Sequence, residues 1–195
     1  MTYIAIGAVG AIGLWYGVMR WAPAIAGMDS LGARMLFTLK CWVAAITFSL
    51  LAGVEAVAHE RLRSPAFDPL AGFETRRLLV NQRYLQNTLE QTVIFTAALF
   101  GLAAYCPDGQ AMRAVVAASL VWLLGRLAFW AGYHHSAAAR GLGVGGMGLS
   151  LILVVYVCAR FGGEIAGRAG AMAMVAAFVA LEGFLFWATR PVSRP

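Results

Sequence analysis

Residues 112–133 of the sequence read MRAVVAASLVWLLGRLAFWAGY, and this run decides the fold class. A helix needs about 20 consecutive, mainly apolar residues to cross the hydrocarbon core of a bilayer, and the run meets that length. Its apolar residues are continuous, whereas a membrane β-barrel strand alternates apolar and polar residues. The run therefore predicts a transmembrane helix.

The rest of the chain repeats this pattern. Of the 195 residues, 61% are apolar and 12% charged, whereas a soluble domain is roughly 45–50% apolar. We expect an all-α integral membrane protein with six spans, with the lipid bilayer as its main partner. No positively charged region precedes the first span, so we interpret it as uncleaved. The other five expected spans are residues 3–19, 35–58, 85–105, 146–159 and 170–188.

The positive charge of the chain predicts its orientation. The net charge is +6 and comes mostly from arginines near the ends of spans. Arginines at these positions set the orientation of membrane helices, so nucleic-acid binding is the weaker interpretation. The longest polar segment, residues 59–83, carries Arg61, Arg63, Arg76, Arg77 and Arg83. We expect this segment on the cytoplasmic side, and with six spans both termini share that side.

The third expected span opens with a polar sequence, residues 81–91, which read NQRYLQNTLEQ. At about 100° per residue on a helix, Arg83, Asn87 and Glu90 lie within roughly 60° of one another. One such residue alone is typical of an interfacial cap whose side chain reaches water. Three on one face, with Glu90 inside the span, favour a polar site, because ionisable groups within a bilayer are costly and usually functional.

The fourth expected span closes on a second polar face. If the helix continues to Arg140, then Arg126, Phe129, Tyr133 and Arg140 lie within roughly 60° of one another. Tyr133 or Arg140 alone would suit an aromatic belt with an arginine that sets topology. Arg126 does not suit that interpretation, since it lies about two turns inside the span. Both faces end at the same side of the membrane.

Together these two faces resemble the motifs of the MAPEG family, the membrane-associated proteins of eicosanoid and glutathione metabolism. Within that family, the spacing from the Gly-Tyr pair to the last arginine is most similar to that of leukotriene-C synthase. The motifs are Arg83-x-x-x-Asn87-x-x-Glu90 and then Arg126-Leu127-x-x-x-x-Gly132-Tyr133 followed by Arg140.

The resemblance implies a membrane-embedded transferase or peroxidase that uses glutathione as co-substrate against a lipophilic small-molecule substrate. It implies a homotrimer with its glutathione site between subunits, on the cytoplasmic side of what we expect to be a bacterial inner membrane. Arg140 would be the catalytic residue, because it would stabilise the glutathione thiolate. The residues expected to bind substrate or co-substrate are Arg83, Asn87, Glu90, Arg126, Phe129 and Tyr133; no metal is expected.

The same resemblance divides the chain into three parts. Residues 35–160 would form a four-helix MAPEG-like core, residues 1–34 would add an N-terminal transmembrane helix and loop, and residues 161–195 would add a C-terminal transmembrane helix and tail. Two positions depart from the family pattern. Phe129 stands where the synthase has a tyrosine, and Gln91 replaces an aromatic residue that often follows the glutamate.

These departures leave alternative functions open. One is a non-catalytic lipid-binding or partner-activating membrane protein. Another is a small transporter, suggested by the intramembrane residues Glu90, Arg126 and Glu182. Glu182 lies deep in the last expected span and must be paired, protonated or next to a cavity.

Two further patterns have simpler explanations than ligand binding. The sequence Gly143-x-Gly145-Gly146-x-Gly148 fits the letters of a dinucleotide fingerprint. No βαβ unit surrounds it, so close packing of helices is the better interpretation. His134 and His135 point about 100° apart on a helix, so we expect them to be solvated at the membrane interface rather than to bind a metal.

Overall fold

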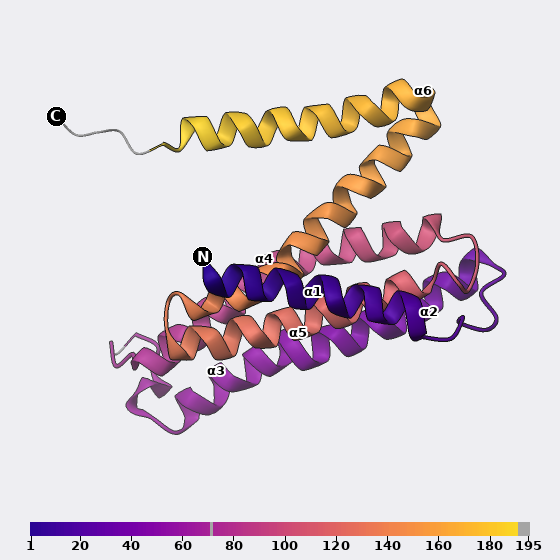
Figure 1. The fold of residues 1–195 in the computed structure, drawn as a ribbon. Coiled ribbons are helices and arrows are strands. Elements are labelled where there is room, and N and C mark those ends of the chain that lie inside the picture. The colour runs from indigo at the N-terminus through magenta and orange to yellow at the C-terminus, as the bar shows by residue number, and fades with distance from the viewer. Residues whose placement is uncertain (71, 191–195) are drawn as a thin grey trace.

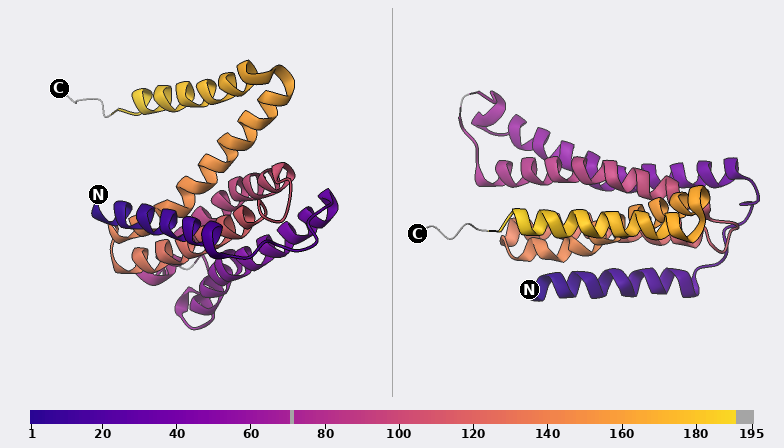
Figure 2. Two further views of the ribbon diagram at one scale, coloured as in Figure 1. Left: turned by 45° about the vertical axis from the view of Figure 1, so that its right-hand side comes forward. Right: turned by 90° about the horizontal axis from the view of Figure 1, so that it is seen from above.

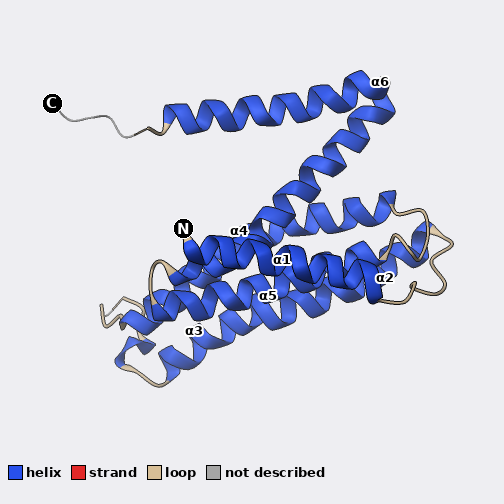
Figure 3. Ribbon diagram, in the orientation of Figure 1, coloured by secondary structure: helices blue, strands red, loops and turns tan. Residues whose placement is uncertain are grey.

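The computed structural model describes residues 1–70 and 72–190, and these residues form helices joined by loops, without a strand (Figure 3). The expected all-α fold is confirmed. The elements are α1 Thr2–Trp21, α2 Leu31–Ile46, η1 Thr47–Leu51, α3 Ala52–Leu62, η2 Pro65–Phe67, α4 Arg76–Tyr105, α5 Arg113–His135, η3 Ala139–Gly143 and α6 Val144–Ala188.

Among the described residues, five continuous helical segments are long and apolar enough to cross a bilayer. The last contains both the fifth and the sixth expected spans, because α6 is one element that is broken at Ala166 and Gly167. Gly167 has φ +60°, a left-handed conformation that glycine adopts without a Cβ clash. We call residues 144–165 the proximal arm of α6 and residues 168–188 the distal arm. Each arm has about the 20 residues that one span requires.

The second expected span is continuous but contains a π-helical turn. α2 passes into η1, a five-residue π-helix, and then into α3. The π turn lies where α4 contacts it: the buried hydroxyl of Tyr84 donates a hydrogen bond of 3.1 Å to the carbonyl oxygen of Ser49. A π turn inside an α-helix often marks a functional region. Here it accepts the side chain that anchors α4 to this span.

The core of the bundle lies between α4 and α5, with α2 beside them. Trp122 of α5 stacks on Phe95 of α4 with ring centroids 4.4 Å apart, and both side chains are almost fully buried. The helix α1 packs on α5, on η3 and on the beginning of α6 (Figure 1). Gly7 makes that packing possible, since a Cβ there would clash with the carbonyl oxygen of Leu142.

The N-terminus and the end of α6 at Ala188 lie at one end of the bundle. The same end holds the loop between α3 and α4, as the views in Figures 1 and 2 agree. The loops between α1 and α2 and between α4 and α5 lie at the opposite end. The chain path is therefore that of the six expected crossings, with the arginine-rich segment of residues 59–83 beginning at the end where the chain starts.

Candidate functional site

A polar pocket of about 210 Å³ opens between α4, α5 and η3. Six of the seven expected site residues line it, and the seventh, Arg126, lies directly behind Asn87. The structure therefore brings the two sequence motifs together. The lining residues are Arg83, Gln86, Asn87 and Glu90 of α4, Phe129 and Tyr133 of α5, and Arg140 of η3.

The α4 wall of the pocket is a chain of polar side chains. Arg83 donates from Nη1 to Oε1 of Gln86 at 3.4 Å, and Gln86 donates from Nε2 to Oε1 of Glu90 at 3.3 Å. All three are exposed, so these long contacts can be exchanged for contacts with a ligand. Gln86 was not among the expected site residues, although its position three residues after Arg83 and four before Glu90 places it on the same face.

Arg126 forms the floor of the pocket rather than part of its surface. Its side chain is fully buried, and Nη1 donates a hydrogen bond of 2.8 Å to Oδ1 of Asn87. The guanidinium also lies over the ring of Phe129, 4.8 Å from its centroid. Among the described residues, no side chain or backbone group accepts from its Nε and Nη2. Arg126 therefore reaches the pocket through Asn87, whose amide it holds in place.

Arg140 reaches the pocket by a different route from the one expected. The helix does not continue to Arg140, because α5 ends at His135 and Ser136 is extended, with φ −161° and ψ 160°. The chain then folds back over Gly132, where a Cβ would clash with the carbonyl oxygen of Ala139. Arg140 follows in the short 3₁₀ helix η3, and its guanidinium lies 5.7 Å from the ring centroid of Tyr133.

The aromatic side of the site is a connected set of rings. Phe129 meets Tyr133 edge to face, with centroids 5.7 Å apart. Phe129 also lies 6.4 Å from Tyr84, which in turn stacks on Trp130 at 4.7 Å. Tyr84 of α4 thus packs on Phe129, which in turn packs on Tyr133.

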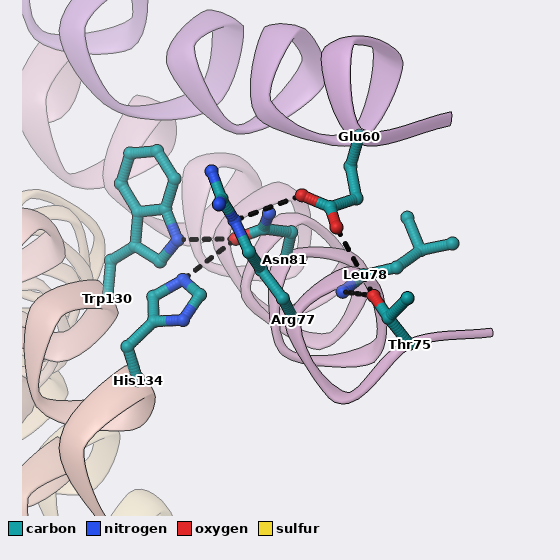
Figure 4. Close-up of polar contacts among 7 residues, drawn as sticks. All are labelled: Glu60, Thr75, Arg77, Leu78, Asn81, Trp130 and His134. Atoms are coloured by element: carbon teal, nitrogen blue, oxygen red, sulfur yellow. Dashed lines mark hydrogen bonds and ion pairs between the residues drawn. The ribbon is translucent and has the colours of Figure 1, made fainter. Parts of the chain in front are cut away.

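A second polar cluster, centred on Asn81, holds this end of α4 and α5 together (Figure 4). Asn81 is buried; its Oδ1 accepts a hydrogen bond of 2.9 Å from Trp130 Nε1 and lies 2.9 Å from His134 Nε2. Beside it, Arg77 of α4 and Glu60 of α3 form an ion pair of 3.0 Å. His134 is partly buried and its ring contacts Asn81, which was not expected, whereas His135 is exposed.

Glu55 and Gly143 are not among the residues that line the pocket. Glu55 is exposed and lies 3.6 Å from His59, while Gly143 packs so closely on Phe129 that a Cβ would clash with it. In the described part of the chain, no three His, Cys, Asp or Glu side chains are grouped as a metal site would require.

An apolar cavity of about 350 Å³ lies on another face of α5. Its walls are apolar, and four of its ten lining residues are glycines. It is lined by Gly7, Gly10, Ala11 and Leu14 of α1, by Val121, Leu124, Gly125 and Ala128 of α5, and by Leu142 and Gly146.

The comparison with known families agrees with the arrangement of these helices and motifs. The model of the MAPEG family matches residues 6–161, which is most of the chain. No curated protein and no solved structure matches it. The similarity to leukotriene-C synthase therefore rests on motif spacing alone, while the family itself is shown: the chain belongs to the MAPEG family.

Proposed function

We propose that this protein is a membrane-embedded, glutathione-dependent transferase or peroxidase that acts on a lipophilic substrate. The observation that carries the proposal is the convergence of Arg83, Asn87, Glu90, Tyr133 and Arg140 on one pocket, although they come from three separate elements. Membership of the MAPEG family supports a glutathione-related role.

The side chains of the pocket match the charges of glutathione. That tripeptide carries two carboxylates, one ammonium and one thiol, so its site needs cations for the carboxylates and the thiolate and an anion for the ammonium. Arg83 and Arg140 are exposed cations on the pocket wall, and Glu90 is its anion. The planar guanidinium of arginine binds carboxylates through two hydrogen bonds and stays charged when water is scarce.

Glutathione as co-substrate would supply the nucleophilic sulfur, and Arg140 would hold that sulfur as a thiolate. A neighbouring cation lowers the pKa of a thiol from about 8.5 to between roughly 3.5 and 7.5. Arg140 lines the pocket from η3, whereas Glu90 lines it from α4, so the two charges can bind different groups of one ligand. Arg83, Asn87 and Glu90 would hold the charged ends of the peptide.

A second copy of the chain would complete the site. The pocket measures about 210 Å³, whereas small-molecule sites typically span roughly 300–1,000 Å³. Most of its polar wall is exposed, so one chain provides only part of an enclosed site. We propose a homotrimer in a bacterial inner membrane, with glutathione between subunits and with the pocket and both termini on the cytoplasmic side.

Binding of glutathione by the detergent-solubilised protein tests the proposal. Isothermal titration should show saturable binding at millimolar concentration or below. The dipeptide Cys-Gly is the matched control ligand, because it keeps the thiol but lacks the γ-glutamyl group that Glu90 and Arg83 would hold. Absence of glutathione binding, or equal affinity for the dipeptide, would contradict the proposal.

The apolar cavity favours a second candidate, a non-catalytic lipid-binding protein. That cavity is larger than the polar pocket and could hold an acyl chain without any use of glutathione. A fluorescent fatty acid separates the two functions. Two results together would support the lipid-binding function. The fatty acid would bind to the wild type but not to Gly10→Leu, and glutathione would not bind in the pocket.

A further inference from the structure

The distal arm of α6 stands away from the bundle. It contacts the proximal arm at the elbow, where Gly162 and Gly170 approach so closely that a Cβ on either would clash with the other's carbonyl oxygen. Beyond the elbow the arm diverges from the other helices (Figures 1 and 2), and nearly all its side chains are exposed. The family model ends at residue 161, before this arm begins.

Glu182 places a carboxylate on this arm, and the hydrocarbon chains of lipid cannot solvate it. It is exposed on a helix whose other residues are almost all apolar, and the ion pairs found among the described residues do not include it. A carboxylate at such a depth in a bilayer is costly unless a cation or a water-filled cavity meets it. On the same face of the arm lie the exposed apolar side chains of Val175, Val179 and Phe186.

The depth of Glu182 identifies the cation that it can meet. Glu182 precedes the end of the distal arm, Ala188, by six residues, which corresponds to about 9 Å at 1.5 Å per residue. Arg83 follows the start of α4, Arg76, by seven residues, or about 10 Å. Both of these helix ends lie at the same end of the bundle (Figure 1). The carboxylate and the guanidinium therefore lie at similar distances from this end of their own helices.

Two cations within other helices fit less well. Lys40 is exposed, but it follows the start of α2 at Leu31 by nine residues, about 13 Å from the opposite end of the bundle. Arg126 is fully buried. Arg83 is exposed, and among the described residues its side chain makes one hydrogen bond, the 3.4 Å contact with Gln86.

We infer that the distal arm docks on a second copy of this chain, where Glu182 pairs with Arg83 at the rim of that copy's polar pocket. The apolar side chains beside Glu182 then pack on the neighbouring bundle instead of facing lipid. Each pocket in the assembly thereby receives one carboxylate from outside its own chain. The inference uses the pocket of the proposed function, and under that function Glu182 and a carboxylate of glutathione compete for Arg83.

Cysteine cross-linking between two differently tagged chains tests this pairing. Both chains have Cys41, Cys106 and Cys158 replaced by alanine; one carries Glu182→Cys and the other Arg83→Cys. A short bismaleimide added to native membranes should give a cross-linked heterodimer, because it spans the gap that a Glu–Arg pair fills and that a disulfide is too short to bridge. The matched control replaces Glu182→Cys by Phe184→Cys, which lies about 200° around the helix and should give little product. No heterodimer, or an equal amount with the control, would overturn the inference.

Trimer stability provides a second measurement that needs no new cysteine. In native mass spectrometry of the full-length protein, Glu182→Gln and Arg83→Gln should each raise the dissociation constant of the assembly about threefold to tenfold, the usual range for a polar contact between membrane helices. The double variant should be no weaker than either single one. Additive effects would overturn the inference. Neither test requires glutathione, so failure of glutathione binding and failure of arm docking are separate results.

Discussion

The guanidinium of Arg126 donates a hydrogen bond of 2.8 Å from Nη1 to Oδ1 of Asn87, and this bond joins the two sequence motifs of the site. It runs from a fully buried cation in α5 to a residue on the pocket wall of α4. The amide oxygen of Asn87 therefore already accepts a hydrogen bond from within the protein. Its NH₂ group is left to face the pocket as a donor.

Replacing only Asn87 should lower the free energy of unfolding more than replacing both Asn87 and Arg126. Asn87→Leu leaves a buried guanidinium with no acceptor, a loss of about 2–3 kcal/mol for a hydrogen bond to a charged group. Asn87→Leu combined with Arg126→Met removes the charge as well and should recover much of that loss. Thermal unfolding in detergent measures both. A double variant less stable than Asn87→Leu would contradict this role for the bond.

Gly132 sets the position of Arg140. A Cβ at residue 132 would clash with the carbonyl oxygen of Ala139 next to Arg140, so Gly132→Ala should displace η3 and cost about 1–3 kcal/mol as an overpacking change. The control is Gly148→Ala in α6, where a Cβ meets no atom within 4 Å. Unfolding temperatures of the two variants are compared. Equal stability would show that the turn after α5 tolerates a side chain.

Glu90 should contribute to binding rather than to chemistry. Glu90→Gln removes the negative charge proposed for the ammonium of glutathione, and loss of one charge-assisted hydrogen bond lowers affinity by roughly 10- to 100-fold. The control, Glu55→Gln, neutralises a glutamate that is exposed on α3 beside His59. Titration calorimetry with glutathione measures both. Unchanged affinity for Glu90→Gln would remove Glu90 from the proposed site.

The orientation of the chain is tested by labelling. The loops before α4 and before α5 lie at opposite ends of the bundle, so single cysteines at Ser64 and Asp108 should react from opposite sides of sealed membranes. Ser64 should be the cytoplasmic one, because its loop is rich in arginine. Permeabilised membranes serve as the control, in which both react. Labelling of both from one side would contradict the six-crossing path.

Much of this architecture follows from local pattern. Continuous apolar runs predict the spans, and helical spacing alone places Arg83, Asn87 and Glu90 on one wall. The features that helical spacing does not predict depend on contacts between helices. Asn81 faces away from that wall, and its role becomes visible only when Trp130 of α5 packs against it. Likewise, the turn that brings Arg140 to the pocket depends on how closely the chain can approach Gly132.

Near-ultraviolet absorbance of bound glutathione tests most directly whether Arg140 holds the glutathione sulfur as a thiolate. Wild-type protein saturated with glutathione should show the thiolate band at pH 7, because the cation lowers the thiol pKa from about 8.5. With Arg140→Ala the band should appear only above about pH 8.5, while glutathione still binds.

Arg160→Ala is the matched control for that measurement. Arg160 also lies over a tyrosine ring, 4.7 Å from the centroid of Tyr105, but it is not among the residues that line the pocket. Its replacement should leave the band unchanged. A thiolate band at pH 7 that is absent in the wild type, or that is equally strong with Arg140→Ala, would contradict the account.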